Sequence, residues 1–492
     1  MAVSLAVVVA TRGDAAAPDG TARLVPSDAL LYAHLSTSES RTQDARLLAI
    51  AGRFASVRSR VPALGMAFTP AAGGLDLARD VRPWLGDELA VALLDGGSAG
   101  PEPMLLAAVE DRAAAGRLLA RLGAKPAGTH AGTPLLSLPP RASAAFTDEH
   151  LVIGPADAVR GAIDRAAGSG APSLAGGRVF ERAAEGREGA ASLDLFATSA
   201  GLRRLFDGST GLAGVAGRLL LSPRIEGVSA QVAAEERGLR ATAHLLRTSG
   251  GPEPAAFEPT LADRVPSDAA GFLALPGLDA VTAIAQRAGA AAAIAGLEEA
   301  LPTAAGLELE DLLAPLSDEA ALTVTTGEAA PIVTLTARTS DEASTRESLA
   351  QLQGPLSERL GGGPFTQSRV RGADAFSLRA TPQLAPSYAI SKGAVVASTA
   401  TSGLEQLGSA RSPVTGASVL EDLMPGEGEK VEALGFLDSR QLLALGERTG
   451  LQALSSPAAR DDLGRIRTAG AVVKEDATQP TDTTAELFLE IP

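Results

Sequence analysis

A Gly-x-Ser-x-Gly motif at Gly96–Gly100 places a serine where a hydrolase could hold its nucleophile. In hydrolases with this motif a strand precedes the serine and a helix follows it, so that backbone N–H groups stabilise an oxyanion. A strand is expected before Ser98, but the segment after it, Met104–Val109, is also expected to be a strand. The motif therefore indicates a hairpin loop, and we predict no nucleophile at Ser98.

The four histidines are candidates for metal ligation or general-base chemistry: His34, His130, His150 and His244. No two of them lie at the short spacing by which one helix or turn supplies two ligands to a metal. Such a role would require the fold to bring distant histidines together. The sequence predicts surface or partly buried histidines without a function.

Four carboxylate pairs occupy matched positions in the two halves of the chain: Asp28 and Asp268, Asp87 and Asp318, Glu88 and Glu319, and Asp111 and Asp341. Two carboxylates that approach each other could share a proton or hold a divalent cation. Structural roles also fit, because Asp28 follows a Pro-Ser turn and Asp111 stands where a helix N-cap belongs. Adjacent strand residues such as Asp87 and Glu88 point to opposite faces and cannot form one acid/base pair. We therefore predict no catalytic, cofactor-binding or metal-binding residue.

Two further features have structural explanations. Trp84 is the only tryptophan, and its counterpart in the second half is Leu316, which indicates a core position. Glycine recurs at every third position in one segment, without the lysine of a phosphate-binding loop, so no phosphate site is predicted. The glycines of this segment are Gly208, Gly211, Gly214 and Gly217.

The composition of the 492-residue chain excludes several classes of function. Asp and Glu number 58 against 43 Lys and Arg, which gives a net charge of −15, and aromatic residues make up 3%. Nucleic-acid binding depends on basic side chains and often on aromatic stacking, so no nucleic-acid partner is predicted. The chain contains no cysteine, which excludes disulfides, thiolate metal sites and thiol nucleophiles.

An internal duplication organises these residues. Val25-Pro26-Ser27-Asp28-Ala29 recurs as Val265-Pro266-Ser267-Asp268-Ala269, a separation of 240 residues. Further segments match in the same order and at nearly the same separation, for example Ala145–Ile163 with Ala389–Leu407. Ordered matches at a nearly constant spacing indicate two copies of one domain, and the period is far too long for a solenoid.

The hydrophobic pattern predicts an α+β fold for each copy. Strands are expected at Leu30–Leu35 and Gly271–Leu275, each followed by a helix, a hairpin, a helix, two strands, a helix, a strand, a helix and a closing hairpin. Period-two alternation and short connections favour mainly antiparallel sheets with helices packed on one side. The predicted domains are residues 21–250 and 261–492, joined by a linker at 251–260 that is rich in Gly and Pro.

The N-terminal segment 1–20 combines an apolar run, Ala2–Ala10, with a small-residue segment that reads as a linker. The run is far shorter than the roughly 20 residues that span a bilayer, and it lacks the basic region of a signal peptide. We interpret it as the stump of an export signal or membrane anchor that begins upstream. The alternative is an Ala-rich tail of a cytoplasmic protein.

The sequence resembles a bacterial family known as domain of unknown function 3352 (DUF3352). The resemblance rests on the Val-Pro-Ser-Asp-Ala segments in both halves and on Gly86-Asp87-Glu88-Leu89-Ala90, which enters a strand. Members of that family commonly look exported or membrane-anchored, which implies an extracytoplasmic location. The resemblance implies no activity, ligand or catalytic residue.

These observations favour a non-catalytic extracytoplasmic binding or structural protein with a ligand cleft between duplicated lobes. The expected partner is an apolar small molecule or another protein, and no cofactor is predicted. The alternative is a hydrolase or metal-assisted enzyme whose residues meet only in the folded chain.

Overall fold

The computed structural model describes most of the chain. The described residues are 19–36, 46, 50, 53–54, 77–185, 193–206, 224–248, 255–286, 314–316, 318–328, 330–361, 363–381, 384–426, 428–449, 457–475 and 482–492. Of the features singled out in the sequence, the apolar run Ala2–Ala10 and the glycines of residues 208–217 lie outside them. Most of the first helix expected after β1 does as well.

The described residues of the first half, up to residue 248, form ten strands. In space they follow the order β4-β5-β6-β7-β3-β2-β1-β8-β9-β10, and every neighbouring pair is antiparallel. Their bounds are β1 Leu31–Ser36, β2 Leu85–Asp95, β3 Pro101–Val109, β4 Lys125–His130, β5 Thr133–Leu138, β6 Ala142–Phe146, β7 His150–Gly154, β8 Leu193–Thr198, β9 Ile225–Glu235 and β10 Gly238–Arg247.

The second half, from residue 255 onward, has the same strand order. Its strands follow the order β14-β15-β16-β17-β13-β12-β11-β18-β19-β20, again with antiparallel neighbours throughout. Their bounds are β11 Ala269–Leu275, β12 Ala320–Thr325, β13 Ile332–Arg338, β14 Thr366–Val370, β15 Ala373–Ser377, β16 Ser387–Ser391, β17 Ala394–Ser398, β18 Ala433–Asp438, β19 Thr468–Glu475 and β20 Thr483–Glu490.

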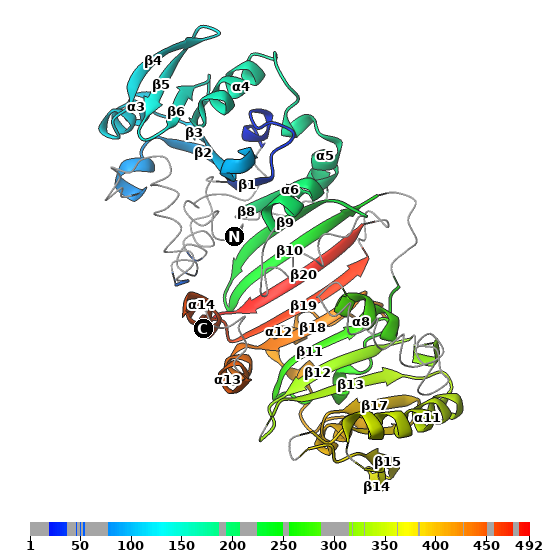
Figure 1. The fold of residues 1–492 in the computed structure, drawn as a ribbon. Coiled ribbons are helices and arrows are strands. Elements are labelled where there is room, and N and C mark those ends of the chain that lie inside the picture. The colour runs from blue at the N-terminus through cyan, green and yellow to red at the C-terminus, as the bar shows by residue number, and fades with distance from the viewer. Residues whose placement is uncertain are drawn as a thin grey trace.

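Within the described residues, the two halves join edge to edge into one twenty-stranded sheet (Figure 1). The last strand of each half makes the junction, with β10 paired antiparallel to β20 from Gly238 opposite Glu490 to Leu245 opposite Thr483. An ion-pair network spans the same junction, because Arg182 contacts both Glu226 of its own half and Asp482 of the other half. The junction is therefore built from both backbone pairing and buried charge.

Helices cover both faces of the sheet, which corrects the prediction that they pack on one side. In the first half α4 packs against Leu106 and Val152, whereas α3 packs against the neighbouring residues Ala107 and Leu151 on the opposite face. Central strands such as β7 are buried on both faces, so their apolar side chains need cover on each side. The helix bounds are α3 Arg112–Arg121, α4 Ala156–Ala166, α5 Arg178–Glu185, α6 Ser199–Phe206, α8 Gly277–Ala285, α11 Glu342–Leu360, α12 Ser418–Glu421, α13 Ser439–Thr449 and α14 Pro457–Arg465.

The repeated Val-Pro-Ser-Asp segments make the same contacts in both halves. Pro26 forms a β-bridge with Ser173, and Pro266 forms one with Pro413. The carbonyl of Val25 accepts a hydrogen bond from the N–H of Leu174, as the carbonyl of Val265 does from Val414. These repeated residues fasten the segment before the first strand of each half, which is a structural task.

Two expectations about the segments between elements were wrong in detail. The connection from α3 to α4 contains the four strands β4 to β7 rather than two, and α11 is likewise followed by β14 to β17. Phe257 and Thr260 lie in the predicted linker but belong to the second half. Phe257 is buried in its core, and Thr260 bonds to Glu319.

No helix among the described residues combines the length and apolar character needed to cross a membrane. The location of the protein stays a prediction.

Candidate functional site

Glu88 ties the N-terminal segment of the first half to the sheet. Its carboxylate accepts hydrogen bonds from the backbone N–H groups of Gly20 at 3.1 Å and Thr21 at 3.0 Å. The side chain lies on one face of β2, where it is 8% exposed, while neighbouring Asp87 is exposed on the other face. A Cβ at Gly20 would lie 3.1 Å from a Glu88 carboxylate oxygen, so a larger residue here would have to displace the carboxylate by a few tenths of an ångström.

The second half has the same tie without the surrounding chemistry. Glu319 accepts hydrogen bonds from the N–H and hydroxyl of Thr260 and from the N–H of Leu261. The glutamate is thus the structural element that both halves share. Polar residues that surround Glu88 but have no equivalent around Glu319 need a different explanation.

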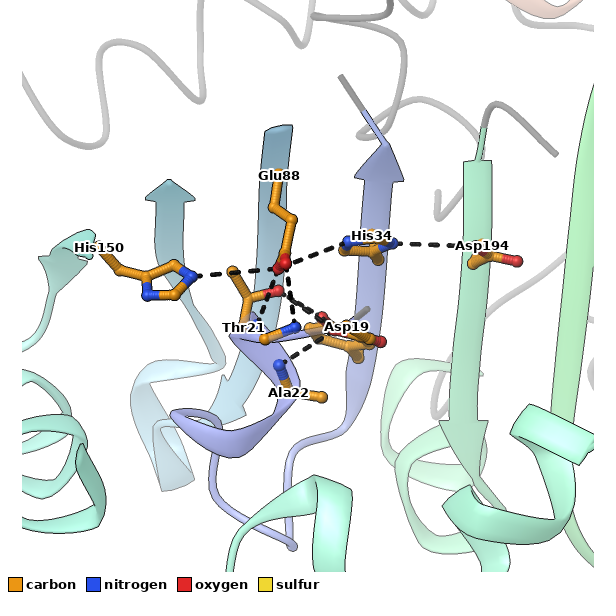
Figure 2. Close-up of polar contacts among 9 residues, drawn as sticks. Asp19, Thr21, Ala22, His34, Glu88, His150 and Asp194 are labelled. Carbon is orange, nitrogen blue, oxygen red and sulfur yellow. Dashed lines mark hydrogen bonds and ion pairs between the residues drawn. The ribbon is translucent and has the colours of Figure 1, made fainter. Parts of the chain in front are cut away.

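His34 lies between two carboxylates in the first half (Figure 2). Its Nε2 atom is 3.8 Å from a Glu88 oxygen, and its Nδ1 atom is 3.8 Å from an Asp194 oxygen. Both distances exceed a hydrogen bond, and both ring nitrogens are buried without a hydrogen-bond partner. His150 approaches from the other side of Glu88, with its Nε2 4.0 Å from the same carboxylate (Figure 2).

Strand register brings these side chains together at the same end of neighbouring strands. His34 is near the last residue of β1, and directly opposite it stands Asp194, near the first residue of β8. Glu88 and His150 lie near the starts of β2 and β7, and antiparallel pairing puts all of these ends together. The cluster therefore depends on contacts between residues that are far apart in the sequence.

Asp19 completes the cluster below His34 (Figure 2). Its carboxylate accepts hydrogen bonds from the N–H of Ala22 at 3.1 Å, from the Thr21 hydroxyl at 3.3 Å and from the Tyr32 hydroxyl. Tyr32 also lies 2.6 Å from the Thr21 hydroxyl oxygen and stacks on the His34 ring at 6.3 Å between centroids. This network fixes the position of the Asp19 carboxylate beside the imidazole.

The carboxylates favour a charged imidazole at His34. Burial lowers the pKa of His34, but Asp194, Glu88 and Asp19 raise it more, so that its pKa is about 9. Burial raises the pKa of Glu88, but His34 and the two backbone N–H donors lower it by more. The pKa of Glu88 is therefore below its ordinary value. The cluster thus holds a positive charge among negative ones in a buried setting.

His150 and Tyr32 are held in their neutral forms. Burial lowers the pKa of His150, although Glu88 opposes this shift. Burial, with the nearby Asp19 carboxylate, raises the pKa of Tyr32 well above its ordinary value. A neutral imidazole and a neutral phenol can each donate one hydrogen bond to a carboxylate or to a bound ligand.

The second half has apolar residues at the positions of this cluster. His34 and Asp194 stand directly opposite each other, and Ala274 and Leu434 occupy the same register in β11 and β18. Phe272 occupies the position of Tyr32, and Leu261 occupies that of Thr21. The remaining counterparts are Pro259 for Asp19 and Ala394 for His150. The fold can therefore be built with apolar side chains at these positions.

The cluster offers a donor set that suits a metal ion. Asp19, His34 and Glu88 each present a ligand atom, and these atoms lie within 4.8 Å of one another. Imidazole nitrogen and carboxylate oxygen are the ligands that zinc and related divalent ions prefer. Without an ion, the same groups form a buried imidazolium–carboxylate network.

The residues that the sequence singled out lie elsewhere or have structural roles. Ser98 lies in the turn between β2 and β3, as predicted. Asp111 and Asp341 cap α3 and α11 by accepting backbone N–H bonds, and Trp84 is 4% exposed in the core, also as predicted. His130 pairs with Asp164 at 2.8 Å and is partly exposed.

The prediction of surface or partly buried histidines was wrong for three residues. His34 is 2% exposed, and His150 and His244 are each 8% exposed. The functional interpretation also missed the meeting of His34 and His150 at Glu88, because strand pairing creates it. A usable signal was present in the sequence, since Ala274 and Ala394 replace these two histidines in the second half.

Comparison with known proteins identifies the family. A sequence model described as "Protein of unknown function (DUF3352)" matches residues 1–361. The chain belongs to the DUF3352 family. The matched region includes every residue of the cluster around Glu88 in this DUF3352 chain. No curated protein matches it.

Solved structures give only remote likenesses to this DUF3352 chain. Crystal form I of TP0453 is 12% identical, with 48% of this chain and 82% of that chain covered and a TM-score of 0.29. Crystal form III of TP0453 is 13% identical, with 47% and 80% covered and a TM-score of 0.27. Likenesses at this level carry no argument about fold or function.

Proposed function

We propose that this DUF3352 chain is a non-catalytic extracytoplasmic binding protein, built by duplication of one α+β unit, whose ligand site is the cluster around Glu88. The duplication is supported by the shared strand order and by the matching bridges of Pro26 and Pro266. It is also supported by the two glutamates, which accept backbone N–H bonds at equivalent points.

The observation that carries the binding proposal is the difference between the halves. Burying charged groups is unfavourable unless they are well paired, and apolar replacements of similar volume are often neutral or stabilising by about 1–4 kcal/mol. The second half has apolar residues at these positions, with Leu434 where the first half has Asp194 and the smaller Ala274 where it has His34. A cluster that stability does not require is expected where a ligand is bound.

Burial supports a binding role rather than catalysis on a large substrate. His34 is 2% exposed, Tyr32 is 1% exposed and Thr21 is fully buried. A hydrolase must admit its substrate to the reacting groups, whereas an enclosed cluster suits an ion or a very small ligand. Asp194 keeps 16% of its side chain exposed and lies on the open side of the cluster.

A metal-assisted enzyme is the second candidate, because one imidazole and two carboxylates are also found in hydrolytic metal sites. An apolar small molecule in a cleft between the halves, or a protein partner, stays a prediction from the sequence. The cluster favours a charged ligand over an apolar one.

The extracytoplasmic part of the proposal rests on the apolar N-terminal run and on the family resemblance. Fractionation of cells that express the chromosomal copy, with immunodetection of the C-terminal half, tests it. We expect the protein in the exported or membrane fraction. A wholly cytosolic protein that keeps Met1 or Ala2 as its N-terminus would contradict the location.

A double exchange tests the binding site itself. His34→Ala with Asp194→Leu installs the cross-strand pair that the second half carries at the same register. We expect the ligand-free variant to lose no more than about 2 kcal/mol, because no unpaired charge of this pair remains and the main cost is the space left by the buried His34 ring. A loss of about 3–5 kcal/mol, as for a broken buried ion pair, would show that the first half needs the cluster for stability.

A further inference from the structure

The imidazole of His34 is oriented as a metal-ligating histidine would be. A ligating histidine commonly directs one ring nitrogen to the ion and the other to a carboxylate that fixes its orientation. Here Nδ1 faces Asp194 and Nε2 faces Glu88, each at 3.8 Å. Both nitrogens are buried and make no hydrogen bond, so the ring is aimed into the cluster with only the two carboxylates near its nitrogens.

The spacing of the ligand atoms leaves room for an ion. Two ligand atoms bound to one tetrahedral zinc ion at ~2.1 Å stand roughly 3.4 Å apart. Nε2 of His34 and the nearest Glu88 oxygen are 3.8 Å apart, so a shift of a few tenths of an ångström would bring both to bonding distance. The Asp19 carboxylate offers a third ligand atom within 4.8 Å of these two.

The surrounding residues hold the ligands in place. Glu88 is fixed by the N–H groups of Gly20 and Thr21, and Asp19 is fixed by the hydroxyl of Tyr32 and the N–H of Ala22. Preorganised ligands of this kind reduce the ordering that ion binding would otherwise require. Each carboxylate oxygen also has more than one lone pair, so a hydrogen-bonded oxygen can still bind an ion.

We infer that Asp19, His34 and Glu88 bind one divalent transition-metal ion of the zinc class, which displaces the Nε2 proton of His34 to solvent, and that Asp194 orients the imidazole. This inference rests on the proposed function and names its ligand. Three protein ligands leave a fourth position for water or a small anion. The second half has no such site beside Glu319, because Ala274 and Leu434 occupy the positions of His34 and Asp194.

The nitrogen ligand favours zinc-class ions over magnesium and calcium. Mg²⁺ and Ca²⁺ prefer sites made of oxygen, whereas imidazole suits zinc, copper, iron and nickel. His150 contributes from the other side, where its Nε2 lies 4.0 Å from Glu88. In this arrangement His150 is a positioning residue for the Glu88 carboxylate.

Isothermal titration of the untagged, metal-stripped full chain with Zn²⁺ tests the inference. We expect one equivalent to bind the wild type, and no saturable binding by the variant His34→Ala with Asp194→Leu. His150→Ala should weaken binding roughly 10–100-fold, as is typical for residues that position a ligand. His130→Ala is the matched control, since His130 pairs with Asp164 away from the cluster, and it should bind like the wild type.

X-ray absorption of the zinc-loaded wild type gives a second readout that needs no variant. The expected spectrum has nitrogen and oxygen ligands with the scattering of a single imidazole. Absence of saturable Zn²⁺ binding, or equal binding by the double variant, would overturn the inference. The proposed function would survive that result if the double variant stays as stable as the wild type, and would fail with the inference if the variant unfolds.

Discussion

Replacing Glu319 by alanine removes the structural tie of the second half without touching the cluster of the first. The carboxylate accepts three hydrogen bonds, from the Thr260 N–H at 3.1 Å, the Thr260 hydroxyl at 2.7 Å and the Leu261 N–H at 2.9 Å. The variant leaves the N–H of fully buried Leu261 without its acceptor.

The expected loss in the free energy of unfolding follows from these three hydrogen bonds. A hydrogen bond to a charged group contributes about 1.5–3 kcal/mol net, and an orphaned buried N–H costs about 1–3 kcal/mol. Burial raises the pKa of Glu319, which means that desolvation of the carboxylate offsets part of the gain. Water can also reach the exposed Thr260. We therefore expect a loss of about 3 kcal/mol.

Urea unfolding and hydrogen exchange measure this loss at two levels. The Leu261 amide should exchange on the order of 100-fold faster, since each 1.4 kcal/mol corresponds to a factor of ten. Exposed Glu328→Ala is the control and should change stability by less than about 0.5 kcal/mol. A Glu319→Ala variant that loses less than 1 kcal/mol, with unchanged exchange at Leu261, would refute a structural role for the shared glutamate.

Three other perturbations separate structure from chemistry. Asp482→Ala removes the partner of Arg182 across the junction of the halves and the acceptor of the Arg247 N–H, and should cost about 1–3 kcal/mol in urea unfolding because Arg182 keeps Glu226. A loss below about 0.5 kcal/mol would mean that backbone pairing alone holds the junction. Ser98→Ala should leave binding and stability unchanged, and specific labelling of Ser98 by a serine-reactive phosphonate would contradict the loop interpretation. Because burial raises the folded-state pKa of Glu319 above 4.5, the additional stability that comes from protonating it is full below pH 4.5 and is lost as pH rises through the folded-state pKa. The stability of the wild type relative to Glu319→Gln should therefore fall with rising pH in that window, and a rise in urea midpoints would contradict the sign.

Much of the fold could be predicted from the sequence, because the local hydrophobic patterns and the repeated segments indicate the same elements. The two Val-Pro-Ser-Asp segments marked equivalent turns, and the strands expected at Leu30–Leu35 and Gly271–Leu275 lie within two residues of the bounds of β1 and β11. The position of the helices was harder to foresee. Alternation suggested one buried face, but central strands such as β7 are buried on both faces by helices from distant parts of the chain.

The cluster around Glu88 could not be located from spacing along the chain. His34, Glu88, His150 and Asp194 stand on four different strands, and only antiparallel register brings their ends together. Matched carboxylates drew attention to what the halves share, which is the structural role of Glu88. The positions where the halves differ, such as His34 against Ala274, carry the chemistry.

Anomalous diffraction from crystals of the full chain grown with Zn²⁺ tests the central claim most directly. The account predicts one peak at about 2.0–2.2 Å from Nε2 of His34 and from an oxygen of Glu88, with no peak beside Glu319. Zinc bound only on the surface, or equally at both glutamates, would contradict the claim that the first half alone holds a ligand site.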